Sequence, residues 1–167
     1  GTADPDLRER VHLLHNTLGP VAGAFAAYRV QRGQRTLAVR MERHCDNAEA
    51  VAAFLSGDPR VERVMFPGLP AHPGHEVAAA QMSRFGGMVS FQPKGGVEAA
   101  ERIAAATEVF TLAVSLGGVE SLIEVPAPMT HASTAGSPLE PPADLIRLSV
   151  GIEHVDDLIA DLDRALG

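Results

Sequence analysis

The sequence Asp-Leu-Ile-Arg-Leu-Ser-Val-Gly at residues 144–151 predicts a β-strand near the end of the chain, and the expected architecture follows from it. Successive side chains of a strand point to opposite faces of the sheet. One face of this strand carries the apolar side chains Ile146, Leu148 and Val150. The other face carries Leu145, Arg147 and Ser149. Residues 155–166 then repeat apolar side chains at helical spacing, so a strand and an amphipathic helix close the chain.

Earlier segments repeat this alternation of strands and helices. Three further strands are predicted, at 61–66, 88–92 and 109–115, with helices around residues 77–82 and 97–103 between them. A proline-rich loop over 126–142 precedes the last strand. The N-terminal part predicts three helices, at about 5–18, 21–31 and 36–56, with Phe25 and Tyr28 facing inward. Four strands separated by helices, after a helical arm, indicate an α/β layer whose sheet is covered on one face.

Bulk composition limits the classes of protein to consider. The chain has 167 residues, 46% of them hydrophobic, which suits one domain or one domain with a leading arm. A formal charge of −7 argues against a nucleic-acid surface, and no apolar run approaches the roughly 20 residues that span a bilayer. No signal peptide is recognisable. The lone Cys45 lies on an apolar helix stripe and cannot form an internal disulfide, so we expect a cytoplasmic location.

Arg147 is the most informative candidate for a functional site. A guanidinium in the middle of a short apolar strand is costly to desolvate unless it meets an anion. Its planar fork matches a carboxylate, so Arg147 is interpreted as a substrate-carboxylate contact. The alternatives are an internal ion pair or an arginine on an exposed sheet face, and the strand pattern alone favours these alternatives.

The second candidate site is the segment 112–122, where a strand is expected to end at Ser115 and two glycines to turn the chain into a short helix. Backbone amides and a hydroxyl at such a turn suit an anion, although an ordinary strand–turn–helix junction explains the same residues. A hydrolase using Ser115 and His131 lacks a nucleophile-elbow sequence. The spaced histidines lack the cysteines or carboxylates of a zinc site, so no metal site is expected.

Six segments together resemble one enzyme family, in its order and spacing, across nearly the whole chain. The family comprises cystathionine γ-synthase, cystathionine γ-lyase and methionine γ-lyase, the pyridoxal-phosphate enzymes of cysteine and methionine metabolism. The segments are Arg-Met-Glu-Arg-His at 40–44, Phe-Pro-Gly-Leu-Pro-Ala-His-Pro at 66–73, Phe-Gly-Gly-Met-Val-Ser-Phe at 85–91, Phe-Thr-Leu-Ala-Val-Ser-Leu-Gly-Gly-Val-Glu-Ser-Leu at 110–122, Pro-Ala-Pro-Met-Thr-His-Ala-Ser at 126–133 and Ile-Arg-Leu-Ser-Val-Gly-Ile-Glu at 146–153.

This resemblance implies the small C-terminal domain of the aspartate-aminotransferase-like fold, fold type I, with a mainly antiparallel sheet and helices on one face. Residues 1–35 would connect it to a missing large domain, and residues 36–167 would form the small domain. The family's catalytic lysine and its pyridoxal 5'-phosphate contacts belong to that large domain. The only lysine here, Lys94, does not match it. We therefore expect no catalytic and no cofactor-binding residue in this chain alone.

The resemblance also assigns substrate contacts. Arg147 matches the arginine that grips the substrate α-carboxylate, Ser115 the serine beside it, and Thr130 a threonine near the active site. Val114 replaces a frequent acidic residue, which suits an uncharged substrate side chain. The implied activity is β- or γ-elimination or replacement at a C–S bond of a sulfur amino acid, in a homo-oligomer built as a dimer of dimers. The alternative is a non-catalytic binding or assembly module that retains the fold.

Overall fold

The computed structural model describes residues 3–129, 136–137 and 140–167, which fall into two compact units. The first unit ends at Leu37 and the second runs from Ala38 to Gly167. None of the described helices is both long enough and apolar enough to cross a membrane.

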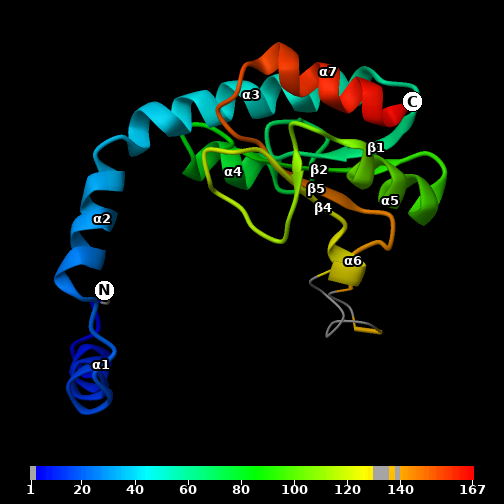
Figure 1. Cartoon of the computed structure of the whole chain (residues 1–167). Coiled ribbons are helices and arrows are strands. Elements are labelled where there is room, and N and C mark those ends of the chain that lie inside the picture. The colour runs from blue at the N-terminus through cyan, green and yellow to red at the C-terminus, as the bar shows by residue number, and fades with distance from the viewer. Residues whose placement is uncertain (1–2, 130–135, 138–139) are drawn as a thin grey trace. The chain divides into compact units, whose positions relative to one another are not determined.

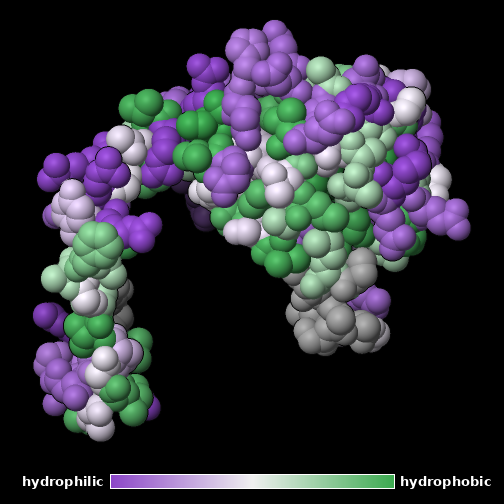
Figure 2. Space-filling model, viewed as in Figure 1, coloured by the Kyte–Doolittle hydropathy of each residue, from purple (hydrophilic) through white to green (hydrophobic). Residues whose placement is uncertain are grey.

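The first unit consists of two helices, α1 (Pro5–Leu18) and α2 (Ala24–Gln34). Asp4 caps α1, since its side chain accepts hydrogen bonds from the backbone N–H groups of Asp6 and Leu7 at 3.0 and 3.2 Å. No residue of either helix is buried. Phe25 and Tyr28 are 73% and 58% exposed, so the prediction that they face inward is wrong for this chain. Figure 2 shows green apolar side chains on these helices among purple hydrophilic ones.

The second unit is built on a five-stranded sheet in the order β1-β2-β5-β4-β3. Neighbouring strands are antiparallel, except that β4 and β3 are parallel. The central position of β5 agrees with the apolar face predicted for it. The strands are β1 (Val61–Met65), β2 (Met88–Pro93), β3 (Thr111–Leu112), β4 (Leu122–Glu124) and β5 (Ile146–Ser149). The mixed α/β fold with a mainly antiparallel sheet is therefore confirmed.

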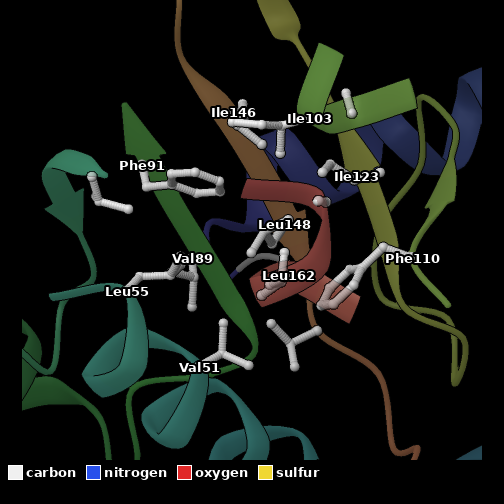
Figure 3. Close-up of a cluster of buried hydrophobic side chains, with 14 of the residues drawn as sticks. Val51, Leu55, Val89, Phe91, Ile103, Phe110, Ile123, Ile146, Leu148 and Leu162 are labelled. Atoms are coloured by element: carbon white, nitrogen blue, oxygen red, sulfur yellow. The ribbon is translucent and has the colours of Figure 1, made fainter. Parts of the chain in front are cut away.

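Helices and sheet share one hydrophobic core. Figure 1 shows α3 and α7 on the same side of the sheet. Side chains from α3, α5 and α7 join those of the strands in this core, which Figure 3 shows from close by. Cys45 is 3% exposed, in agreement with its predicted place in the core. The helices of the unit are α3 (Leu37–Gly57), α4 (His75–Gln81), α5 (Gly96–Ala106), α6 (Pro126–Met129) and α7 (Val155–Leu166).

Residues 109–124 differ from the sequence prediction. The strand predicted over 109–115 is reduced to the two residues of β3, and β4 was not predicted. Residues 113–121 are irregular and lead directly into β4, so the short helix expected after Ser115 is not observed. The segment therefore crosses between two neighbouring strands. The loop predicted over 126–142 begins with the single-turn helix α6.

Leu148 at the centre of β5 provides a test of this core. Its side chain is fully buried, so Leu148→Ala is expected to lower the free energy of unfolding by about 2–5 kcal/mol. Urea denaturation measures the change, with Leu112→Ala as the control, since Leu112 is 49% exposed. Equal losses in the two variants would contradict the placement of Leu148 in the core.

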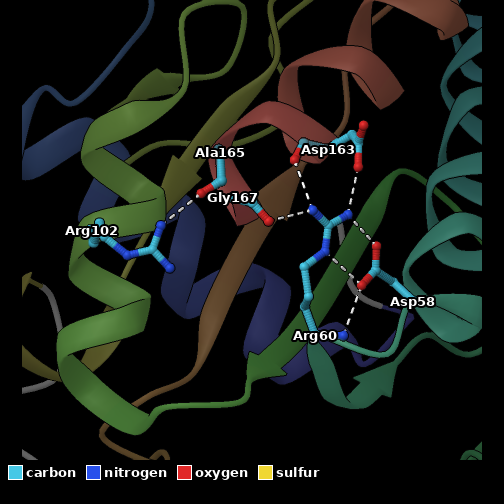
Figure 4. A network of polar contacts seen from close by, with 6 residues as sticks. All are labelled: Asp58, Arg60, Arg102, Asp163, Ala165 and Gly167. Atoms are coloured by element: carbon cyan, nitrogen blue, oxygen red, sulfur yellow. Dashed lines mark hydrogen bonds and ion pairs between the residues drawn. The ribbon is translucent and has the colours of Figure 1, made fainter.

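A polar network fixes the C-terminal end of α7 to the turn before β1 (Figure 4). Arg60 pairs with Asp58 at 2.6 Å and with Asp163 at 2.5 Å, and it donates to the Gly167 carbonyl at 2.8 Å. The hydrogen bonds from Arg60 outweigh burial and hold the pKa of the Asp58 carboxyl below its usual value. Through Arg60, this network links the end of α7 to the residues that precede β1.

Candidate functional site: an arginine on the polar face of the sheet

Arg147 lies on the sheet face opposite the hydrophobic core. Ile146 and Leu148 on either side of it are fully buried in that core, so alternation directs Arg147 to the other face. In the pairing register, Ser90 of β2 is its partner on one side and Glu124 of β4 on the other. The Arg147 side chain is 22% exposed. The predicted orientation of β5 is therefore confirmed.

One nitrogen of the Arg147 guanidinium contacts two oxygen atoms. Nη2 lies 3.0 Å from Oε1 of Glu124, whose side chain is 1% exposed, and it donates to the Ser115 carbonyl at 3.3 Å. The internal ion pair that was the alternative interpretation of Arg147 is thus present. The Glu124 carboxylate of this ion pair is buried, whereas the Arg147 guanidinium remains partly exposed to solvent. We call Arg147, Glu124 and Ser115 the Arg147 site.

The loop that carries Ser115 is fixed to β5 at two points. The Ser115 carbonyl accepts from Arg147, and two residues further on the Gly117 backbone N–H donates to Oγ of Ser149 at 3.0 Å. Arg147 and Ser149 are the two polar residues on one face of β5, so the strand holds the loop through alternate side chains. Ser115 and Val114 are exposed in this chain, Val114 to 56%.

Carboxylates anchor the chain on both sides of the loop that carries Ser115, before β3 and just before β4. At the β4 end, the Glu153 carboxylate accepts from the backbone N–H and the hydroxyl of Ser121 at 2.7 and 2.9 Å. The Ser121 hydroxyl accepts in turn from the Gly151 N–H at 2.8 Å. At the other end, Asp161 of α7 accepts from three consecutive backbone N–H groups at residues 108–110. The loop bearing Ser115 therefore starts and ends at fixed positions.

The structure brings together part of the predicted site. Arg147 and Ser115 are in contact through the serine carbonyl, and Val114 precedes Ser115 in the same loop. Thr130 lies outside the described residues, and so does His131 of the hydrolase alternative. Sequence reasoning missed Glu124. An acidic residue within the apolar run Leu-Ile-Glu-Val at 122–125 needs a partner, and that signal applies to Glu124 as it does to Arg147.

An apolar cavity lies next to this loop. Its volume is about 260 Å³, and Leu116, Gly117 and Ser149 line it together with Met41 and His44 of α3. The His44 ring is buried, and its Nδ1 lies 2.6 Å from the Val150 carbonyl. Arg147 and Ser115 do not line this cavity. Among the described residues no group of three or more His, Cys, Asp or Glu side chains could hold a metal ion.

Lys94 lies at a distance from the Arg147 site. It follows the last residue of β2, and its backbone N–H donates to the Arg60 carbonyl at 2.8 Å. Ser90, the register partner of Arg147, is four residues earlier, which corresponds to about 13 Å along a strand. The only lysine of the sequence therefore lies well away from Arg147 along the direction of β2.

The fold of this chain matches that of solved enzymes. MetB from Corynebacterium glutamicum superposes with a TM-score of 0.95 at 55% identity, covering 99% of this chain and 43% of that one. CalE6, a methionine gamma lyase from Micromonospora echinospora, superposes with a TM-score of 0.87 at 46% identity, covering 98% and 43%. The fold of this chain is therefore the fold found in part of these two proteins, and it places the chain in the same structural class.

The family follows from the sequence comparisons. Residues 2–167 match the model of the Cys/Met metabolism PLP-dependent enzymes, and the chain belongs to that family. The chain is 58% identical to cystathionine gamma-synthase of Mycobacterium tuberculosis over 166 residues, which is 99% of this chain and 43% of that protein. It thus spans less than half the length of these relatives and corresponds to their C-terminal portion. The resemblance inferred from the six sequence segments is confirmed.

Proposed function

We propose that this chain is the substrate-carboxylate-binding portion of a PLP-dependent C–S lyase or synthase that acts on sulfur amino acids. The observation that carries this proposal is the Arg147 guanidinium, which is 22% exposed on the polar face of the sheet. Such a cation can bind an anionic group from outside while its inner nitrogen stays paired. Membership of a family whose relatives include a cystathionine gamma-synthase, a cystathionine gamma-lyase and a methionine gamma lyase supports the choice of substrate class.

Each of the other site residues receives a role in this proposal. Ser115 places its exposed side chain in the loop that contacts Arg147, where it would lie beside the bound carboxylate. Val114 presents an exposed apolar side chain from the same loop, which favours an uncharged substrate side chain. We assign Thr130 to the same site by family resemblance alone. Elimination and replacement at the β or γ carbon both fit these contacts.

Cofactor chemistry would come from another part of the enzyme. Pyridoxal phosphate supplies an electron sink for the carbanion formed at the α carbon. We propose that this chain does not hold the cofactor covalently on its own, because its only lysine, Lys94, lies about 13 Å along β2 from the level of Arg147. The contribution of this chain is to bind and orient the carboxylate.

The same proposal specifies partners and location. Relatives more than twice as long supply a larger domain, which we propose binds the cofactor and covers the exposed apolar side chains of α1 and α2. We further propose residues 1–35 as the connection to that domain, residues 36–167 as the small domain, and a homo-oligomeric complete enzyme. The buried Cys45, the only cysteine, supports a cytoplasmic location.

Arg147→Lys tests the carboxylate contact while keeping the positive charge beside Glu124. Lysine lacks the planar fork, so the affinity for L-methionine is expected to fall by about tenfold. Titration of the isotope-labelled chain, followed by NMR, measures this affinity from amide shifts at residues 113–117 and 147–149. Arg63→Lys is the matched control, since Arg63 is an exposed arginine on β1. Equal affinities in the Arg147→Lys variant and the unmodified chain would remove Arg147 from the site.

A further inference from the structure

Glu124 combines three features that set it apart from the other acidic residues near the sheet. It is the register partner of Arg147 on the neighbouring strand. Its side chain is 1% exposed. Its Oε1 lies 3.0 Å from Nη2 of Arg147, whereas the guanidinium itself is 22% exposed. A carboxylate is therefore held behind the cation, on the side that solvent does not reach.

The protein contacts the Nη2 nitrogen of the Arg147 guanidinium and leaves its other two nitrogens available to a ligand. Nη2 contacts Glu124 and the Ser115 carbonyl. Within residues 3–129, 136–137 and 140–167, neither Nη1 nor Nε of Arg147 has a hydrogen-bond partner. Because directly opposed residues of an antiparallel pair share a face, the inner contact comes from the sheet itself and does not depend on the loop. Nη2 of the guanidinium is thus held in place before any ligand arrives.

We propose that Glu124 is the specificity-determining residue of the Arg147 site, where it positions the guanidinium and makes Arg147 select one planar monocarboxylate over tetrahedral dianions. This inference rests on the proposed carboxylate-binding function and adds the residue that sets its selectivity. Glu124 acts through Arg147 and not by touching the substrate, so it is a positioning residue.

Charge and geometry both lead to this selectivity. The buried negative charge offsets the positive charge that an incoming anion meets, and Coulomb repulsion from it is twice as large for a dianion as for a monoanion. A guanidinium held at Nη2 also offers its remaining N–H groups in the flat arrangement that a carboxylate matches. Removing the charge of Glu124 therefore favours a dianion more strongly than a monoanion.

The test compares two anions on the whole chain. N-acetyl-L-methionine supplies a planar monocarboxylate and sodium sulfate a tetrahedral dianion, each titrated at constant ionic strength. NMR follows the Nε–Hε signal of Arg147 and the amide of Gly117. The unmodified chain is expected to bind the carboxylate at least as tightly as sulfate. In Glu124→Gln, which keeps the side-chain shape, the ratio of sulfate affinity to carboxylate affinity is expected to rise about tenfold.

Glu108→Gln is the matched control, because Glu108 pairs with Arg164 at 3.0 Å but is 79% exposed. The control is expected to leave the ratio unchanged. An unchanged ratio in folded Glu124→Gln overturns the role of Glu124. So does an unmodified chain that prefers sulfate by tenfold, a result that does not depend on whether the variant folds.

The carboxylate-binding function has a separate readout in the same experiment. Weaker carboxylate binding in Arg147→Lys, together with an unchanged ratio in Glu124→Gln, removes only the selectivity role. If the carboxylate leaves the Arg147 signals of the unmodified chain unmoved, both the function and the selectivity role fail.

Discussion

Arg147→Leu is expected to lower the free energy of unfolding by about 3–5 kcal/mol, which is far more than a partly exposed arginine normally contributes. The substitution removes the cation 3.0 Å from Oε1 of Glu124, whose side chain is 1% exposed. The buried carboxylate then loses a counter-ion that offsets its desolvation cost. Urea denaturation at neutral pH measures the loss. The same variant loses the contact to the Ser115 carbonyl, so the loop should also become more accessible to hydrogen exchange.

The double variant Arg147→Leu, Glu124→Leu separates the ion pair from simple loss of packing. Replacing both partners removes the stranded charge, and most of the stability should return. Arg84→Leu is the contrasting control, since its carboxylate partners Glu42, Asp46 and Glu49 are 68%, 60% and 45% exposed. That variant is expected to cost about 1 kcal/mol or less. A double variant as unstable as Arg147→Leu alone would contradict the buried charge of Glu124 as the cause of the loss.

Strand alternation made β5 predictable from sequence. Apolar and polar side chains alternate strictly from Ile146 to Ser149, so a period of two was enough to place Arg147 on the polar face. The long amphipathic helices were similarly clear. The third helix was expected at about 36–56 and is observed as Leu37–Gly57. These elements were predictable because one face of each is buried in a single core.

Alternation fails for β4, which explains why this strand was missed. All three of its residues, Leu122 to Glu124, are buried, so the strand has no exposed polar face that would give an alternating pattern. The glycine pair at 117–118 suggested a turn into a helix, and a strand of three residues has too little sequence to contradict that. Because Glu124 lies on the missed strand, its pairing with Arg147 could not be foreseen. The pair depends on register between segments 23 residues apart, which no local pattern encodes.

Burial of the N-terminal helices was mispredicted for a different reason. Periodicity identifies the apolar stripe of a helix but does not identify what covers it. Phe25 and Tyr28 lie on a helix without a single buried residue. Cys45 carried a similar local signal on α3 and is 3% exposed, on a helix whose other apolar residues pack into the core of its own unit. The difference lies in the neighbouring elements and not in the helix sequence.

Asp161→Asn is expected to destabilise the second unit by about 2–4 kcal/mol at neutral pH, through the loop that leads to Ser115. Asp161 is 3% exposed and accepts the backbone N–H groups of residues 108–110 at 2.9 to 3.0 Å, while Arg164 also pairs with it. An asparagine would turn an amide N–H₂ group toward backbone N–H donors and leave some of them unsatisfied. Because these donors precede β3, loss of the acceptor loosens one anchor of the loop that contacts Arg147.

The pH dependence of this effect has a definite sign. Burial alone would raise the pKa of the Asp161 carboxyl, but the three backbone N–H donors and Arg164 outweigh burial and lower the pKa from its ordinary value of 3.8. A carboxyl whose pKa is lower in the folded than in the unfolded state stabilises the fold above the unfolded value. That contribution is lost as the pH falls through the lowered pKa of the folded state. The stability difference between the unmodified chain and Asp161→Asn should therefore be full at pH 7 and shrink below about pH 3.8.

Urea denaturation at a series of pH values measures this difference. Glu101→Gln on the exposed face of α5 is the control, and it should change stability by about 0.5 kcal/mol or less at every pH. A gap for Asp161→Asn that stays constant from pH 7 to the acid limit would mean that the substitution acts through shape and not through the carboxylate charge. A gap that closes in acid, with hydrogen exchange at residues 108–110 accelerated at neutral pH, would identify the charge of Asp161 as the support for the loop that presents Ser115 to Arg147.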